Sequence, residues 1–431
     1  MEQRLSRAIP REFAAIFFLV ILWLVPGTSE TRKSHPGCQL KMKSTAFDLN
    51  DKEYGTLMTF FFAVDEINRN PDILPNVTLG YHVFDSCGDS QKSVKNVLGI
   101  LSGRRREAPN YSCQKKSKIA GFLGDRYSAT SIAAAQVLGL YGYTQISYGA
   151  TDPLLSDRIL YPYFFRTTQN DLTYYEAIVK LLKYFDWNWV GIMTTRDQSG
   201  ETQLRELSQV ITGRGICIEF IIKISDTLQE NHKDLDIIKK STSQVIIAIG
   251  TCHLNCVYAF LNNKSAQMLQ NITLIYTSSW SYVLTFSIKT GIPFSSGLSF
   301  SALVTEILGL QTFMETVQLS NDVTDPLQED IWLLEFHCLT SNRHKSDFFQ
   351  CLYNFTANNC TGKQNIIDLI SYKTDSIPYL TYTAVNALAR ALHNMNRRFN
   401  RPEKDLLNYE YQNKVNILLS YMLHVMVLEE L

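Results

Sequence analysis

The sequence lacks an excess of charge of either sign. Its 431 residues carry 41 Lys and Arg against 41 Asp and Glu, so the formal net charge is zero. A protein that holds nucleic acid or an anionic membrane surface needs a basic patch, and this balance gives no reason to expect one. The one short basic run, Arg104 to Arg106, is typical of a solvated loop. We therefore expect no nucleic-acid partner.

The sequence also lacks the short motifs that mark common catalytic sites. It contains no HExxH pair, no nucleophile elbow, no phosphate-binding Gly-rich loop with Lys and no CxxC. Gly121 and Gly124 lie at the end of an expected strand, but the third glycine of a dinucleotide fingerprint is missing. These observations favour a binding protein over an enzyme, and we expect no cofactor.

Long apolar runs are confined to the N-terminus. Arg4, Arg7 and Arg11 precede an apolar run from Phe13 to Val25, and small residues follow at 27–29. A basic flank, a short apolar stretch and a small-residue exit are typical of a secretory signal peptide. The run is too short to span a bilayer comfortably. We expect residues 1–29 to be a leader and the mature chain to be soluble and secreted.

Export makes disulfides the ordinary state of cysteine. The chain has nine cysteines, and an odd number suggests an intermolecular bridge or a missing partner. His253 lies between Cys252 and Cys256, but two thiols and one imidazole in an oxidising compartment make a poor metal site, so no metal is expected. Roughly half of the six glycosylation sequons would arise by chance, so they support export only weakly. The sequons begin at Asn76, Asn110, Asn263, Asn271, Asn354 and Asn359.

From residue 54 onward, short apolar runs alternate with longer segments of helical spacing. This alternation predicts crossover connections and parallel sheets, and the number of units exceeds what one open sheet carries. We therefore predict an α/β protein with two sheets in two lobes. The polar segment 342–373 is expected to be a long disulfide-pinned loop, and 415–428 a packed helix or frayed end. Strands are predicted at 79–84, 119–123, 145–148, 163–166, 189–194, 216–224, 245–250 and 273–276, and helices at 54–68, 128–140, 172–185, 201–212 and 378–396.

The segment from Phe60 to Asn68 reads FFFAVDEIN, and several further motifs follow it along the chain. Together they resemble the ligand-binding ectodomain of class C G-protein-coupled receptors, and their order and spacing follow the calcium-sensing branch from about Leu57 to Met395. Detail in Asn70-Pro71 and in the WNW segment at 187–189 is most similar to the vomeronasal type 2 pheromone receptors. Further matches are LPNVTLGY at 74–81, LGL at 138–140, QISY at 145–148, FDWNWVG at 185–191, GICI at 215–218 and CTG at 360–362.

The resemblance implies a bilobed type I periplasmic-binding-protein fold, the Venus flytrap, which closes on its ligand. Lobe 1 would comprise 38–167 and 303–431, and lobe 2 would comprise 168–302. The family's opening strand and long loop have no room in 38–54, and its stalk and membrane domain are absent. The chain would then be a truncated gene model, a splice product or a secreted fragment. A G protein would couple only through that missing membrane domain.

The resemblance also implies a set of polar residues that grip an amino acid. Ser128 and Thr151 would donate hydroxyls to a carboxylate, Gly149 and Ala150 would offer backbone groups, and Asp171 would bind the ammonium. Each polar side chain has a structural alternative: Ser128 as a helix N-cap, Asp171 as the cap of a helix from 172, and Thr151 as ordinary turn chemistry.

In lobe 2 the resemblance is weaker. Ser199 stands where the family has an aromatic residue, and Ser278 stands where relatives have an acidic one. A serine cannot supply the cation–π attraction of about 0.5–2 kcal/mol that an aromatic ring gives. The implied ligand is therefore a weakly held amino acid, or a larger molecule such as a peptide.

The cysteines also acquire roles by resemblance. Cys338 and Cys360 match a loop disulfide, and Cys87 matches half of a bridge whose only upstream candidate is Cys38. Cys113 lies near the family's intermolecular bridge, which implies a homodimer or a heterodimer with related receptors. Cys217 matches the cysteine that binds the stalk, so it should be a free thiol here, and Cys351 has no assignment.

The function predicted from these residues is the extracellular ligand-binding region of a class C chemosensory receptor, taking a small polar ligand such as an amino acid or peptide. It would lie outside the plasma membrane in an intact receptor, or be secreted if the chain is complete. The alternative is a secreted, non-signalling decoy or dimer partner of such receptors. A natriuretic-type peptide receptor is disfavoured by the set Ser128, Thr151 and Asp171.

Overall fold

The computed structural model divides the chain into two compact units, which we describe separately. Unit 1 contains 1–150, 157–168 and 304–431, and unit 2 contains 151–156 and 169–303. The structure describes residues 18–26, 51–75, 77–102, 119–225, 236–251, 269, 272–280, 297–302, 305–319, 333, 336, 338–339, 346, 358–360 and 375–399.

Unit 1 contains a five-stranded sheet in the order β2-β1-β3-β4-β5. Strands β3, β4 and β5 are parallel, whereas β1 runs antiparallel to both of its neighbours. The strands are β1 (Phe18–Pro26), β2 (Val77–Asp85), β3 (Ile119–Leu123), β4 (Gln145–Ser147) and β5 (Phe164–Arg166).

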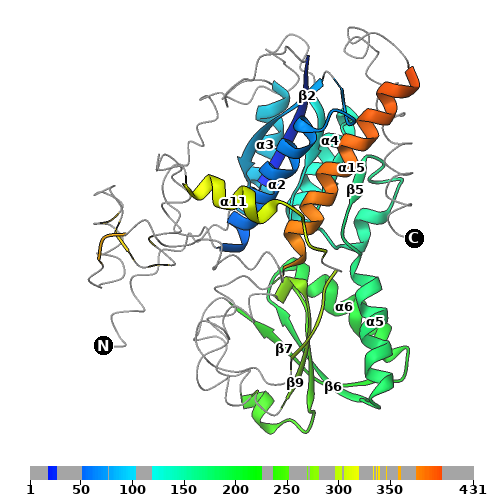
Figure 1. Cartoon of the computed structure of the whole chain (residues 1–431). Coiled ribbons are helices and arrows are strands. Elements are labelled where there is room, and N and C mark those ends of the chain that lie inside the picture. Colours follow the sequence, from blue (N-terminus) through cyan, green and yellow to red (C-terminus); the bar gives the residue numbers. More distant parts are fainter. Residues whose placement is uncertain are drawn as a thin grey trace. The chain divides into compact units, whose positions relative to one another are not determined.

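Helices cover both faces of this sheet. On one face, α2 (Asp51–Arg69) packs beside α15 (Ser376–Phe399), and α11 (Leu310–Leu319) contacts α2 (Figure 1). On the other face, α3 (Ser90–Ser102) and α4 (Ser128–Tyr141) enclose Phe122 of β3. The neighbouring Gly121 faces the opposite helical layer, because a Cβ atom built on it would lie 3.3 Å from Leu388 of α15. Strand alternation therefore separates the two helical layers.

Most of the apolar run for which the sequence predicts a leader forms β1, an inner strand of the unit 1 sheet. Ile21 is paired with His82 of β2 on one side and with Phe122 of β3 on the other. Cleavage after residue 29 would remove β1, so the proposed leader and this strand compete for the same residues.

Unit 2 contains a second five-stranded sheet in the order β10-β9-β8-β6-β7, and all of its paired strands are parallel. Two helices, α5 (Asp171–Tyr184) and α6 (Gln198–Thr212), pack on one face through a shared apolar core. In β8 all four residues are buried, as expected for an inner strand covered on both faces. The strands are β6 (Trp189–Thr195), β7 (Cys217–Ile224), β8 (Val245–Ala248), β9 (Thr273–Thr277) and β10 (Gly297–Phe300).

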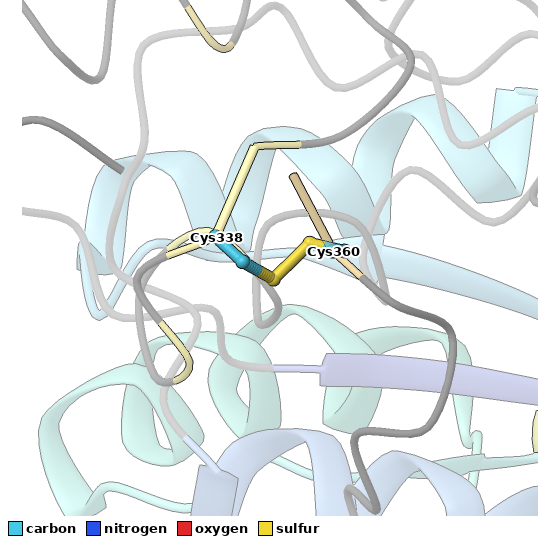
Figure 2. The surroundings of a disulfide bond; sticks show 2 residues. All are labelled: Cys338 and Cys360. Carbon is cyan, nitrogen blue, oxygen red and sulfur yellow. A yellow bond between two sulfur atoms is a disulfide. The ribbon is translucent and has the colours of Figure 1, made fainter. Parts of the chain in front are cut away.

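A disulfide joins Cys338 to Cys360, the pair that the resemblance implied (Figure 2). Backbone bonds flank it: Leu339 N donates to Asn358 O, and Cys360 N donates to Leu339 O, both at 2.8 Å. Closing a loop of 22 residues restricts the unfolded chain by about 3 kcal/mol in the chain-entropy account.

The predicted α/β class with two largely parallel, helix-flanked sheets is confirmed. Among the described helices, none is both long and apolar enough to cross a membrane. The segment predicted at 415–428 lies outside the described residues, as does most of the predicted loop at 342–373.

Candidate functional site

Two of the residues predicted to bind ligand lie along one edge of the unit 2 sheet. Because the strands are parallel, β6, β8 and β9 all end at the same edge, and α6 begins there directly after β6. Helix α5 precedes β6 and ends near the start of that strand. The N-terminus of α5 therefore lies toward the same carboxyl edge of the sheet. In open α/β sheets this carboxyl edge is where ligands bind. Ser199 follows β6 and Ser278 follows β9, so both predicted residues lie at this edge.

Ser199 lies in the first turn of α6, within a small hydrogen-bonded group. Its Oγ is 3.4 Å from Thr251 Oγ1 and accepts a bond of the same length from Gln203 Nε2. The Gln203 Oε1 atom accepts from Gly250 N at 2.7 Å. Asp197 caps the helix by accepting from Gly200 N at 2.9 Å. Ser199 therefore does not cap α6, and its hydroxyl is held in place by Thr251 and Gln203.

Two glycines let this edge close tightly around Thr195. A Cβ atom on Gly200 would lie 2.2 Å from Thr195 O, and one on Gly250 would lie 2.3 Å from Thr195 Oγ1. Gly250 also has a φ of 86°, a left-handed conformation that side chains disfavour. Both positions therefore require glycine.

Ser278 begins the short 3-10 helix η2 (Ser278–Trp280), and its side chain lies outside the described part of the structure. Its neighbours are well anchored. Thr277 Oγ1 and Ser279 Oγ are 2.7 Å apart, and the buried Trp280 donates from Nε1 to Ile249 O at 3.1 Å. This anchoring fixes the backbone of η2.

Asp171 is the first residue of α5 and is almost fully buried, with 5% of its surface exposed. Asn170 caps the helix, because its Oδ1 accepts from Thr173 N at 3.0 Å. The alternative that Asp171 acts as the cap is therefore wrong. Asp171 N donates to Thr151 O at 2.9 Å, so the structure brings these two predicted residues together.

Ser128 is likewise the first residue of α4, in unit 1. The N-cap position belongs to Tyr127, which is extended at φ −96° and ψ 146° and makes no side-chain capping bond. The alternative that Ser128 is the N-cap is wrong for this reason. A half-buried hydroxyl at a helix N-terminus is suited to an anion, because the first N–H groups point outward.

The loop that contains Gly149 and Ala150 is held by hydrogen bonds to Ser147 and Arg166. Both N–H groups donate to Ser147 Oγ, at 3.2 and 2.9 Å, and Ala150 O accepts from Arg166 at 3.1 Å. A Cβ on Gly149 would lie 2.6 Å from Arg126 O, so only glycine fits beside that strand end. The predicted backbone groups thus shape the loop, while their N–H donors are already engaged.

The sequence analysis missed a buried charged group beside Ser128. Asp125 is fully buried and accepts from Ser86 Oγ and Arg126 N, each at 2.5 Å. Arg126 forms an ion pair of 2.5 Å with Glu53, and both side chains are buried. Burial raises the pKa of Asp125 to about 6 against the lowering effect of its hydrogen bonds. The sequence signal that could have revealed this buried group is the pair Asp125-Arg126, which follows β3 after Gly124.

Two cysteines in the described residues are free thiols, Cys87 and Cys217. Cys217 is exposed at the start of β7. Cys87 contacts Lys92 and lies 2.9 Å from Asp85 Oδ2, and burial raises the pKa of its thiol. The partner proposed for it, Cys38, lies outside the described residues, so that pairing stays a prediction.

Other predicted positions cannot be placed. Of the sequons, only Asn359 is described, and it is exposed. The remaining sequon asparagines and cysteines lie outside the described residues, namely Asn76, Asn110, Asn263, Asn271, Asn354, Cys113, Cys252, Cys256 and Cys351.

Comparison with known proteins identifies the family of this chain. Residues 56–425 match the family described as the receptor family ligand binding region. The chain is 32% identical over 357 residues to mouse vomeronasal type-2 receptor 26, which covers 79% of the chain and 40% of that receptor. It is 26% identical over 374 residues to the human extracellular calcium-sensing receptor, which covers 80% of the chain and 34% of that receptor.

The chain therefore spans less than half the length of these curated relatives. The match extends through both units, from within α2 to beyond α15. The matched family consists of receptor ligand-binding regions rather than enzymes, in agreement with the sequence prediction. The chain belongs to the receptor family of ligand-binding regions and is similar to the extracellular part of class C G-protein-coupled receptors.

Proposed function

We propose that the chain is the ligand-binding region of a class C chemosensory receptor and that it binds an amino acid or a short peptide. Units 1 and 2 are the two lobes of this proposed region. The similarity to a vomeronasal receptor and to a calcium-sensing receptor supports the receptor class. The residues proposed to hold the ligand are Ser128, Thr151, Asp171, Ser199 and Ser278, with Gly149 and Ala150 shaping the loop.

One observation carries the proposal. Ser128 and Asp171 each begin a long helix, and in each case the preceding residue occupies the cap position. The hydroxyl of Ser128 would meet a ligand carboxylate, where the dipole of α4 also favours negative charge. The carboxylate of Asp171 would meet an ammonium through a charge-assisted hydrogen bond.

Isothermal titration calorimetry with a panel of amino acids and short peptides tests the proposal. We expect Ser128→Ala and Asp171→Asn each to weaken binding of the best ligand by about 10- to 100-fold, since each removes a hydrogen bond to a charged group. Asp186→Asn is the matched control, because Asp186 is exposed beyond the other end of α5. Absence of heat with every compound in the panel would refute the proposal.

We also propose that the region forms a covalent dimer through Cys113 and that residues 1–29 direct its export. Gel electrophoresis of protein secreted from cultured cells, with and without reductant, tests the bridge. A Cys113→Ser variant should run as a monomer in both conditions. A wild-type band at monomer size without reductant would contradict the bridge.

A further inference from the structure

The hydroxyl of Ser147 joins two segments of unit 1 that belong to the proposed ligand site. Ser147 is the last residue of β4 and is fully buried. Its Oγ donates to Asp125 O at 2.6 Å, in the turn between β3 and α4. The same atom accepts from Gly149 N at 3.2 Å and from Ala150 N at 2.9 Å, in the loop after β4. The hydroxyl therefore binds both segments at once, using its proton and its lone pairs.

The turn at Asp125 is tied in the same way to the start of α4. Asp125 N donates to Ser131 Oγ, and Ser131 Oγ donates to Asp125 O, both at 3.1 Å. Ser131 N closes the first turn of α4 by donating to Tyr127 O at 3.0 Å. Ser128, the first residue of α4, lies between these anchors. A displacement of Asp125 would therefore also displace the helix start that carries Ser128.

The loop after β4 also packs directly on this turn. A Cβ atom on Gly149 would lie 2.6 Å from Arg126 O and 3.1 Å from Arg126 Cγ, so the two backbones are in close contact. Arg126 is held in turn by its buried ion pair with Glu53 of α2. The turn before Ser128 is thus fixed by α2, by α4 and, through Ser147, by β4.

We propose that Ser147 is a positioning residue for ligand binding, whose hydroxyl holds the start of α4 in place against the loop at Gly149 and Ala150. The inference rests on the proposed function, in which Ser128 meets the carboxylate of the ligand. Because Ser147 is fully buried, it acts through Ser128 and the loop without touching the ligand. A site that is held in its binding geometry before the ligand arrives loses less conformational entropy on binding.

Amide hydrogen exchange of the protein without added ligand, resolved by residue, tests the bridge. Ser147→Ala removes the acceptor of Gly149 N and Ala150 N, so faster exchange of these two amides is expected whatever the role of Ser147. The informative amide is that of Ser131, which lies beyond Asp125 and does not bond to Ser147. We expect it to exchange about tenfold faster in Ser147→Ala. Unchanged exchange at Ser131 would overturn the inference.

Two further variants control this measurement. Ser243→Ala is the matched control, because the buried Ser243 hydroxyl also bonds to three backbone groups, but in unit 2. It should leave exchange at Ser131 unchanged. Ser147→Thr keeps the Oγ atom and should retain the protection of the wild type. If Ser147→Ala fails to fold, Gly149→Ala decides the matter, since its Cβ would displace the turn without removing a bond of Ser147.

Calorimetry with amino acids and short peptides as probes tests the effect on binding. We expect Ser147→Ala to weaken each compound that binds the wild type by about tenfold. The double variant Ser128→Ala/Ser147→Ala should bind no more weakly than Ser128→Ala alone, because Ser147 acts through Ser128. Additive losses would overturn the positioning role and leave the proposed function intact. Absence of binding by every probe to the wild type would instead refute the proposed function and the positioning role together, even if exchange at Ser131 responds.

Discussion

The two sheets have five strands each but differ in the direction of one strand and in where their strands come from. All paired strands of the unit 2 sheet are parallel, and they follow one another within residues 189–300. The unit 1 sheet inserts β1 antiparallel between β2 and β3, and its covering helix α15 comes from the far end of the sequence. Unit 2 is thus built from local crossovers, whereas unit 1 depends on segments that are distant in the chain.

This difference predicts that removing the N-terminus damages only unit 1. A chain that starts at residue 30 loses β1, which leaves the facing edges of β2 and β3 without ladder partners. In refolded protein, hydrogen exchange of β3 amides should accelerate by at least about 100-fold, equivalent to about 3 kcal/mol. Amides of β6 and β8 should keep their protection, which provides the internal control. Unchanged exchange in β3 would show that unit 1 folds without β1 and would favour the leader.

The next largest effect is expected at Gly250 in unit 2. An alanine there would place its Cβ 2.3 Å from Thr195 Oγ1 at a φ of 86°. We expect Gly250→Ala to lower the free energy of unfolding by about 2–4 kcal/mol, through strain and steric overlap. Gly139→Ala in α4 is the control: its Cβ meets nothing within 4 Å, so it should stabilise the protein by about 0.5–1 kcal/mol. Equal denaturation midpoints for the two variants would contradict the close packing at this edge.

A smaller, pH-dependent effect is expected in unit 1. The pKa of Asp125 is raised from 3.8 to about 6 in the folded state, mainly by burial. The folded state then binds more protons than the unfolded state between these values, so stability falls as pH rises from about 4 to 6. The loss should reach about 2–3 kcal/mol, and Asp125→Asn should abolish it because the amide does not titrate. Urea denaturation of both proteins at pH 4 and pH 7 measures the difference, and equal pH dependence would refute it.

Prediction from sequence succeeded where short-range patterns decide the structure. The apolar run at 119–123 and the helical spacing from Ser128 gave β3 and α4 with nearly correct bounds, because burial and period are local properties. The residue that caps a helix was harder to predict, since either of two adjacent polar residues can occupy the N-cap position. Asn170 rather than Asp171 caps α5, and only backbone geometry distinguishes them.

Features that depend on distant contacts were not predictable in this way. The apolar run at 18–26 is equally consistent with a leader and with an inner strand, because both need continuous hydrophobicity. The ion pair between Arg126 and Glu53 joins residues 73 positions apart, and no periodicity links them.

The smallest predicted effect distinguishes the two acidic residues of α6. Lys223 and Glu201 form an ion pair of 2.5 Å across the surface of unit 2, with both side chains more than 40% exposed. Solvent screens such a pair, so Glu201→Gln should change the free energy of unfolding by less than about 0.5 kcal/mol at physiological salt. Glu206→Gln should instead stabilise the protein, since it removes a half-buried charge that burial and the nearby Asp152 both disfavour. Parallel urea titrations compare the two variants, and destabilisation by Glu206→Gln would mean that its charge is already neutralised within unit 2.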